Sequence, residues 1–406
     1  MLKIFYILGL YFFTIKHLKF VQIYNRLKKY IYKVTVSSCS KCNINPELKR
    51  LKYFCYKNKS LKNDKSLSFL NQNYKFETIS WQPKGYDRLW VYNLNYFDFI
   101  NDTSSYNFKK KYSYYLIMDW IKNNINKQDN ISWEPYPTSL RIVNWTKWYL
   151  LGNRFEVLMF RSIYQQLRWL DKNIEKHILG NHLLANAKAL IYGSVLFLDE
   201  EAIIWQKKGI KLLFNEIQTQ ILEDGGHFER SPMYHSIILE DILDIINLSK
   251  SYTNLLSEKN LRKLKAISSN MLYWLSQMTH PDGKISFFND SAHSVAIYPV
   301  DLFKYAYSLG IKLKNSINNK VLFYTHLQNT GYVKAKIEHA VLFADIGNLG
   351  PDYLLGHSHA DTLSFELSLF DKRIIVNGGT STYENNDIRL LERSTASHNT
   401  IEINNK

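Results

Sequence analysis

The spacing of apolar residues changes once along the chain, and this change constrains the fold more than any other feature. From about Trp90 to Thr330, apolar side chains recur every three or four residues, as in residues 155–178 (FEVLMFRSIYQQLRWLDKNIEKHI). After Gly331 they alternate in short runs that are separated by turns. The first spacing is typical of amphipathic helices and the second of β-strands. We therefore expect a helical domain followed by an all-β domain.

Helical spacing recurs in several further stretches of about 12–20 residues, with short Gly, Asn and Asp breaks between them. These stretches are 105–126, 138–151, 183–198, 200–222, 234–253, 259–279 and 298–311. Their order predicts a succession of antiparallel helix pairs. Such pairs stack in a line as a solenoid or curl into a closed toroid, and spacing alone does not choose between the two.

The 406 residues divide into three expected regions. Residues 1–75 hold a basic helix and a loosely ordered polar connection, residues 76–330 form the helical domain, and residues 331–406 begin the β-domain. The chain ends in a predicted strand, NTIEIN (399–404), so we expect a truncated β-domain. A small sheet with unpaired edges has a thin core, which predicts low stability for residues 335–406.

Residues 17–33, HLKFVQIYNRLKKYIYK, have the pattern of a basic amphipathic helix. They follow an apolar run at 4–15, which is shorter than the ~20 residues of a membrane-spanning helix. No small-x-small cleavage site follows that run. The basic helix is expected either to make peripheral contact with a membrane or to pack on the protein with its lysines outward. We favour packing.

The chain is basic, with 52 Lys and Arg against 36 Asp and Glu, a formal net charge of +16. A Lys-rich coding bias spread over the surface is one explanation, and an acidic partner is the other. No RNP, zinc-finger or Walker-type motif occurs, so we expect no nucleic acid as partner. Anionic lipid and polyanionic glycan remain.

Polar side chains gather where elements are expected to end. They include Tyr, His, Asn and Arg, whereas no G-x-S-x-G or H-E-x-x-H motif is present. These groups suit β-elimination from a uronic acid, which needs one group to neutralise the carboxylate, a base for the C5 proton and an acid for the departing oxygen. The pair His357 and His359 is also informative, because residues i and i+2 of a strand share a face and can both bind a metal.

Six segments, taken in order, resemble the heparinase II/III family of bacterial proteins, which is related to alginate lyases and other polysaccharide lyases. They are WEPYPTSLRIVNWTKW (133–148), GNHLLANAKAL (180–190), DGGHFERSPMYHSIILEDILD (224–244), DGKISFFNDSA (282–292), GHSHADTLSFELSL (356–369) and RSTASHNTIEI (393–403). HLKFVQIYNRL and LWVYNLNYFDF resemble the branch found among capsule and exopolysaccharide genes. The resemblance implies an incomplete (α/α) toroid, then an antiparallel β-sandwich, with the active cleft between them.

The resemblance also implies roles for single residues. The amide at position 181 would neutralise the substrate carboxylate with help from the adjacent imidazole. The phenol at 234 would be the Brønsted acid, and in some relatives also the base, while the imidazole at 357 would act from across the cleft. The expected catalytic residues are thus Asn181, His182, Tyr234 and His357, and the expected substrate-binding residues are Arg230 and His235.

A zinc in the β-sandwich is a further implication of the resemblance. The matching positions are His359, Asn377 and His398. Several family members have Asp at the second of these positions, and a neutral amide is a weaker zinc ligand than a carboxylate. We therefore expect weak zinc binding or none.

Two other functions stay open beside a polysaccharide lyase acting on an anionic polysaccharide. A catalytically inactive glycan-binding or assembly component of surface-polysaccharide biosynthesis would keep the fold, and Asn377 and the short β-domain favour it. A glycoside hydrolase would need two opposed carboxylates, for which Glu229, Asp290 and Glu134 are available. The resemblance favours the bacterial periplasm or cell envelope, with the cytoplasm as an alternative because no signal cleavage site is clear.

Overall fold

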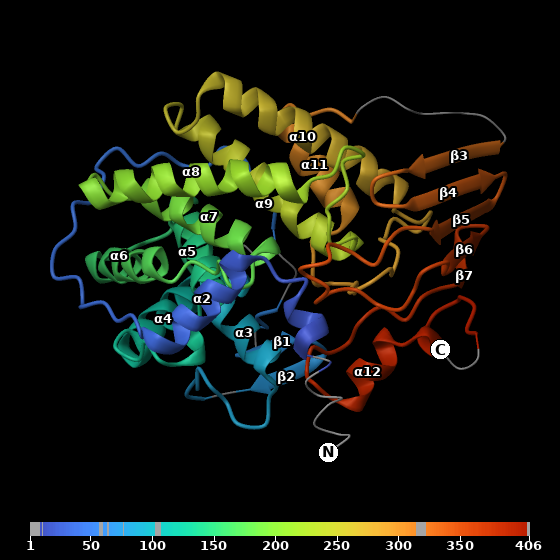
Figure 1. Ribbon diagram of the computed structural model, residues 1–406. Coiled ribbons are helices and arrows are strands. Elements are labelled where there is room, and N and C mark those ends of the chain that lie inside the picture. Colours follow the sequence, from blue (N-terminus) through green and yellow to red (C-terminus); the bar gives the residue numbers. More distant parts are fainter. Residues whose placement is uncertain are drawn as a thin grey trace, which may run out of the picture.

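The computed structural model describes residues 9, 11–56, 60–62, 65–75, 77–101, 107–313 and 322–403. Helices make up the larger, N-terminal part, and an antiparallel sheet follows at one side (Figure 1). A short helix, α12 (Asp387–Arg393), and the turn η3 (Thr395–Ser397) come after the last strand. The predicted change from helices to strands is confirmed.

The helices of the helical domain pack around one core. In chain order they are α3 (Arg88–Tyr96), α4 (Asn107–Asn124), α5 (Pro135–Leu150), α6 (Val157–Lys172), α7 (Gly180–Ser194), α8 (Glu200–Gln220), α9 (Pro232–Ser251), α10 (Glu258–Gln277) and α11 (Pro299–Ser308), with the short turns η1 (Asp98–Asn101) and η2 (Ile131–Trp133). Most of them begin and end within a few residues of the expected bounds, because the apolar stripe that buries each helix was readable from its spacing.

Helix α7 lies at the centre of this domain, since nearly all of its residues are buried. It packs against α5, α8 and α9. Gly209 allows α8 to approach α7 closely, because a Cβ at this position would stand 2.9 Å from the carbonyl oxygen of Ala187. This packing anchors the first turn of α7, which carries Asn181 and His182.

The sheet is a five-stranded antiparallel meander in the order β3-β4-β5-β6-β7. Its strands are β3 (Leu322–Leu327), β4 (Tyr332–Ile337), β5 (Ala340–Asp345), β6 (Phe365–Leu369) and β7 (Lys372–Ile375). Burial alternates along β5, and its inward residues Val341 and Phe343 share an apolar cluster with Trp274 and Met278 at the end of α10. The sheet is therefore seated on the helical domain.

Two expectations about the β-domain need correction. The sheet begins in β3, which lies inside the segment assigned to the helical domain. Residues 399–403 form no strand, and position 404 lies outside the described residues. Instead, the side-chain amide of Asn399 donates to the carbonyl oxygens of Phe365 and Val376. Side-chain bonds thus replace the backbone ladder that apolar alternation had suggested.

The N-terminal region packs on the helical domain more closely than a loose connection would. It contains the hairpin β1 (Ser66–Phe69) and β2 (Gln72–Lys75). Its backbone carbonyls also accept bonds from α9, with Asn247 Nδ2 donating to Tyr53 at 2.7 Å and Ser251 Oγ to Arg50 at 2.9 Å.

Helix α2 (Phe20–Ile31) lies before this connection and contacts the remainder of the protein through its polar side. The packing favoured from the sequence had the lysines outward, and Lys28 and Lys33 are indeed exposed. The apolar face of α2, however, is exposed as well instead of being packed on the protein. Among the described residues, no helix combines the length and apolar character needed to cross a membrane.

Candidate active site

A tyrosine from the helical domain and a histidine from the sheet domain meet where the two domains join. Tyr234 lies in the first turn of α9, where Pro232 is the first helical residue and the Ser231 hydroxyl accepts a bond from the Tyr234 backbone N–H. His357 lies in the loop between β5 and β6. The two ring centroids are 3.9 Å apart. Tertiary structure thus brings together two of the predicted catalytic residues.

Asp290 orients His357. Its Oδ2 accepts a bond from His357 Nδ1 and its Oδ1 accepts one from His359 Nε2, both at 2.8 Å. Arg389 of α12 binds the same two oxygens, at 2.5 and 2.7 Å. Burial by itself would raise the pKa of Asp290, but these donors hold it well below its usual value. Asp290 therefore stays charged, and a neutral His357 that donates from Nδ1 carries its lone pair on Nε2.

Tyr383 is a second phenol at this place, and the sequence did not single it out. Its hydroxyl oxygen is 3.0 Å from that of Tyr234. Burial, with the nearby phenol and Asp290 contributing, puts the pKa of Tyr234 well above the usual value for tyrosine. The pKa of Tyr383 is raised for the same main reason. Both phenols are protonated at neutral pH, so Tyr234 can donate a proton. No signal in the sequence marks Tyr383, because its contact joins positions 149 residues apart.

Glu229 is buried between the two sides of the site. Its Oε2 lies 3.4 Å from His357 Nε2, and its Oε1 accepts a bond from the Asn181 backbone N–H at 3.4 Å. Gly180 has a φ of +60°, and a Cβ there would come 2.5 Å from Oε1, so a larger residue would be strained and would displace Glu229. Burial raises the pKa of Glu229 despite the neighbouring His357. Glu229 is therefore easier to protonate than an exposed glutamate.

Asn181 and His182 open helix α7. Asn181 is buried, whereas the His182 side chain is 25% exposed and its Nδ1 lies 3.0 Å from Glu175 Oε1. Burial lowers the pKa of His182, but the charge and hydrogen bond of Glu175 outweigh it and the net shift is upward. The imidazole ring also stacks on Tyr136, with centroids 4.3 Å apart. A cationic imidazole at a helix N-terminus suits an anionic ligand group.

The structure gives the two predicted substrate-binding residues other contacts. The Arg230 guanidinium donates to the backbone carbonyls of Asn348 and Asn329 and so joins α9 to the sheet domain. His235 is fully buried, with its Nε2 3.0 Å from the Met271 carbonyl oxygen. Burial lowers the pKa of His235 to about 3, despite that bond. Neither placement supports direct contact of these residues with a substrate.

The predicted zinc ligands lie close together next to this site. His359 and His398 have ring centroids 5.3 Å apart, and His398 Nδ1 is 3.4 Å from Asn377 Oδ1. The other nitrogens, His359 Nδ1 and His398 Nε2, are buried without a hydrogen-bond partner among the described residues. Burial and the nearby His359 lower the pKa of His398 to about 4, so it is neutral at pH 7, as a metal ligand must be.

These two free imidazole nitrogens fit a zinc ion, whereas the amide at position 377 is a weak third ligand. Within the described part of the chain, no group of three or more His, Cys, Asp or Glu side chains is arranged to hold a metal. The donor set is therefore two histidines and one amide.

The carboxylates considered for glycoside hydrolysis are all engaged. Asp290 binds Arg389 and two histidines. Glu229 adjoins His357 Nε2, and Glu134 binds the Arg88 guanidinium and the Tyr92 hydroxyl. These three groups do not provide an acid and a base that face each other across a sugar. The glycoside hydrolase hypothesis therefore has no support from the structure.

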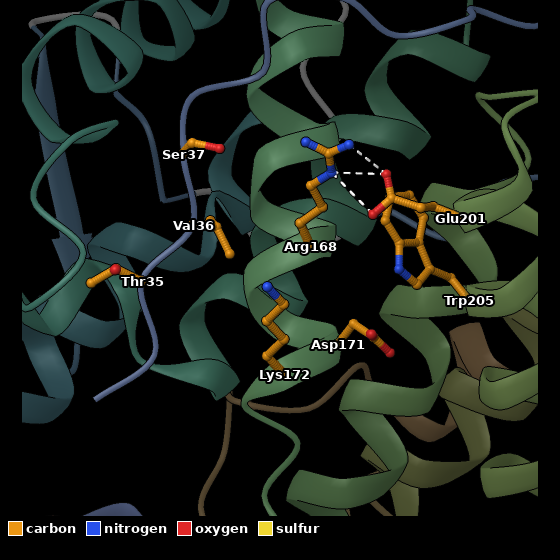
Figure 2. A pocket seen from close by; sticks show the side chains of 8 residues that line it. All are labelled: Thr35, Val36, Ser37, Arg168, Asp171, Lys172, Glu201 and Trp205. Atoms are coloured by element: carbon orange, nitrogen blue, oxygen red, sulfur yellow. Dashed lines mark hydrogen bonds and ion pairs between the residues drawn. The ribbon is translucent and has the colours of Figure 1, made fainter. Parts of the chain in front are cut away.

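A hollow of about 300 Å³ lies elsewhere on the helical domain, between the N-terminal segment and helices α6 and α8 (Figure 2). Its lining residues are Thr35, Val36, Ser37, Arg168, Asp171, Lys172, Glu201 and Trp205. Arg168 binds Glu201 within it. None of the predicted catalytic residues lines this hollow, so the hollow is separate from the candidate active site.

Comparison with known families gives two matches. The family described as Heparinase II/III N-terminus matches residues 20–306, and the family described as Heparinase II/III-like, C-terminal matches residues 324–406. These two stretches include Asn181, Tyr234 and Tyr383, as well as the histidines of the candidate site.

Curated relatives are heparin-sulfate lyases. The chain is 26% identical to that of Bacteroides stercoris over 245 residues, which is 56% of this chain and 36% of the relative. It is 27% identical to that of Bacteroides thetaiotaomicron over 260 residues, 55% of this chain and 36% of the relative. The chain therefore spans about a third of the length of these curated relatives.

Solved structures share the fold. Heparinase III is similar with a TM-score of 0.64 at 18% identity, covering 94% of this chain and 66% of the other. Heparan sulfate lyase HepC from Pedobacter heparinus is similar with a TM-score of 0.50 at 20% identity, covering 82% and 57%. The first likeness confirms the predicted architecture of an (α/α) toroid followed by a β-sandwich.

Proposed function

The chain belongs to the heparinase II/III family, and on this premise we propose that it is a polysaccharide lyase acting on a uronic-acid-containing anionic glycan by β-elimination. The observation that carries this proposal is the close ring contact of Tyr234 and His357 between the two domains. The heparin-sulfate lyases among its relatives support a glycosaminoglycan as the substrate class.

In this proposal the two side chains divide the proton transfers of elimination between them. His357 Nε2, held by the bond from Nδ1 to Asp290, accepts the C5 proton of the uronic acid. The C5–H electron pair forms the C4–C5 double bond as the C4–O bond breaks. The departing oxygen takes its proton from the Tyr234 hydroxyl, which burial keeps protonated.

In this proposal the first turn of α7 stabilises the carboxylate of the substrate. Removal of the C5 proton places negative charge on the uronate carboxylate, and this charge must be stabilised. Asn181 and His182 stand side by side in the first turn of α7, and Glu175 favours the cationic form of His182. In the proposed complex these two residues contact the carboxylate. The net charge of +16 would draw a polyanion toward the protein.

The proposal extends to a zinc ion held by His359, His398 and Asn377. The two unpartnered imidazole nitrogens support it. A bound zinc would add a positive charge that fixes the orientation of both histidines, while the proton transfers remain with His357 and Tyr234. Metal analysis of the purified protein, before and after dialysis against a chelator, tests this. A stoichiometry far below one zinc ion per chain at saturating zinc would refute it.

The lyase proposal is tested by incubating the protein with heparan sulfate, alginate and capsular polysaccharide. The expected result is ultraviolet absorbance from new C4–C5 double bonds on one of them. New reducing ends without unsaturation would instead show hydrolysis. Saturable glycan binding without either product would establish the alternative, an inactive glycan-binding or assembly component, which Asn377 at the metal position favours.

A further inference from the structure

Helix α2 presents its apolar side chains to solvent. Phe20, Tyr24, Leu27 and Ile31 lie on one face, because residues four, seven and eleven apart align along a helix. They are 80%, 54%, 59% and 74% exposed. Four large apolar side chains aligned in this way form a continuous apolar stripe that the described residues leave exposed.

The opposite face of α2 makes the contacts with the protein, and these contacts are polar. Gln22 is buried and its Nε2 donates to the carbonyl oxygens of Ile178 and Tyr353, each at 3.3 Å. Arg26 donates to the His177 carbonyl oxygen, and Lys29 lies 3.4 Å from the His177 ring. An ordinary surface helix would bury its apolar stripe. Here the polar stripe is used for packing, so the apolar one is left for another contact.

The segment around this apolar stripe is strongly basic. Residues 11–46 contain seven Lys or Arg and no Asp or Glu. Lys16, Lys28 and Lys33 are exposed on α2 or next to it. Tyr11, Phe12 and Phe13, just before α2, are also exposed. Exposed aromatic and aliphatic side chains bordered by lysines are the pattern of helices that lie in the interface of an anionic membrane.

We propose that α2 binds the surface of an anionic lipid bilayer, with Phe20, Tyr24, Leu27 and Ile31 inserted among the lipid headgroups and acyl chains and the flanking lysines against the headgroups. Charge complementarity favours an anionic bilayer as the binding partner of α2. A second copy of this strongly basic segment would repel the first, and a soluble polyanion would leave the apolar stripe in water. The proposal is independent of the lyase reaction.

The contacts of α2 also link this surface to the candidate active site. Ile178 lies two residues before Gly180, the first residue of α7, and Tyr353 lies in the same β5–β6 loop as His357. In Figure 1, α2 (blue) crosses the outside of the helical domain on the side where α7 begins. Bilayer binding through α2 would therefore hold the site at a fixed distance from the membrane surface.

The test is flotation of the full chain with lipid vesicles, one set of phosphatidylcholine alone and one in which phosphatidylglycerol is mixed with it. Binding is expected for the mixed vesicles and is expected to fall steeply with added salt. The triple variant Phe20→Ser/Leu27→Ser/Ile31→Ser should partition about tenfold more weakly or worse. Lys16→Gln/Lys28→Gln/Lys33→Gln should weaken it on the order of tenfold as well.

Matched controls come from α6, α8 and α10, where other exposed residues of the same kinds are found. Leu158→Ser/Ile203→Ser/Ile204→Ser removes comparable exposed apolar side chains, and Lys207→Gln/Lys211→Gln/Lys259→Gln removes comparable exposed charges. Both should bind vesicles as the unchanged chain does. Thermal unfolding of every variant distinguishes lost binding from lost folding.

Three outcomes overturn the proposal. The first is no binding to the mixed vesicles, or equal loss in the control variants. The second is self-association in sedimentation, without vesicle binding, that the three serine substitutions abolish, because the stripe would then join two copies. The third is lysine-dependent binding of soluble heparan sulfate without vesicle binding, which would assign the basic segment to a glycan.

Discussion

Helices α7 and α9 carry two buried charge clusters, one at their N-terminal turns and one farther along. The inner cluster, which we call the core ion cluster, consists of Lys147, Lys188, Glu240, Asp241 and Asp244. The outer cluster is the candidate site. Every group of the core ion cluster comes from a helix of one domain, whereas the candidate site combines α7 and α9 with loops of the sheet domain.

The two clusters differ in how completely their polar atoms are paired. Lys188 binds both Asp241 and Asp244, and Lys147 lies 2.5 Å from Asp244. In and beside the candidate site, Glu229 Oε2, His359 Nδ1 and His398 Nε2 have no hydrogen-bond partner among the described residues. Paired buried charges hold helices together. Unpaired buried polar atoms are costly in a fold, and their presence beside Tyr234 and His357 supports a place for ligands.

The largest expected effect is on activity. Replacing Tyr234 with Phe removes the proposed acid and should lower kcat on a cleaved glycan by about 10²–10⁴-fold, with the free energy of unfolding nearly unchanged. Steady-state kinetics and urea denaturation measure the two effects. The matched control is Tyr307→Phe on α11, whose side chain is 75% exposed. Activity within a few-fold of the unchanged chain would remove Tyr234 from the mechanism.

The next effect is on stability. Lys188→Met leaves Asp241 and Asp244 buried with less compensation and should cost about 3–5 kcal/mol of unfolding free energy. The control Lys207→Met, at an exposed position of α8, should change it by less than about 0.5 kcal/mol. Denaturant titration of both variants checks this. A small loss for Lys188→Met would show that the core ion cluster does not stabilise the helical domain.

A smaller effect is expected at Tyr383. Tyr383→Phe removes one hydrogen bond to the Tyr234 hydroxyl, and a net contribution of ~1 kcal/mol corresponds to a loss of about five- to tenfold in kcat. Stability should hardly change. A loss as large as that of Tyr234→Phe would indicate that Tyr383 itself transfers the proton, and no loss would confine it to packing.

The smallest effect concerns pH. The pKa of His182 in the folded protein is raised above 6.5, because Glu175 outweighs burial. The Glu175–His182 pair therefore contributes fully to the free energy of unfolding below pH 6.5. This contribution is lost as the pH rises through the raised pKa of His182. Urea denaturation across this range should show a steeper decline for the unchanged chain than for His182→Gln. Parallel declines would mean that the Glu175–His182 pair does not couple to folding.

Much of the fold followed from the chain itself. The helices from α4 to α10 lie close to their expected bounds because burial of an apolar stripe is a local, periodic property. Residues 399–403 show the limit of such reasoning. Ile401 and Ile403 alternate with polar residues, but a strand also requires a partner edge, and the structure supplies side-chain bonds from Asn399 instead.

The sequence predicted only some of the residues of the candidate site. Tyr234 and His357 were identified from family resemblance, whereas Tyr383 was missed and Asp290 was considered only as a hydrolase carboxylate. Their contacts join positions that are far apart in sequence, as do Arg389 and Asp290. Sequence spacing carries no information about such pairs, so neither the second phenol nor the anchoring of His357 could be inferred from it.

The sequence by itself determined the order of helices and strands, the basic charge and the amphipathic character of residues 17–33, because these depend on composition and short-range spacing. Only the tertiary structure decided which face of α2 is packed and which groups surround Tyr234. Both depend on where distant backbone segments, such as those at Ile178 and Tyr353, offer hydrogen-bond acceptors. Their positions are set by the packing of the two domains.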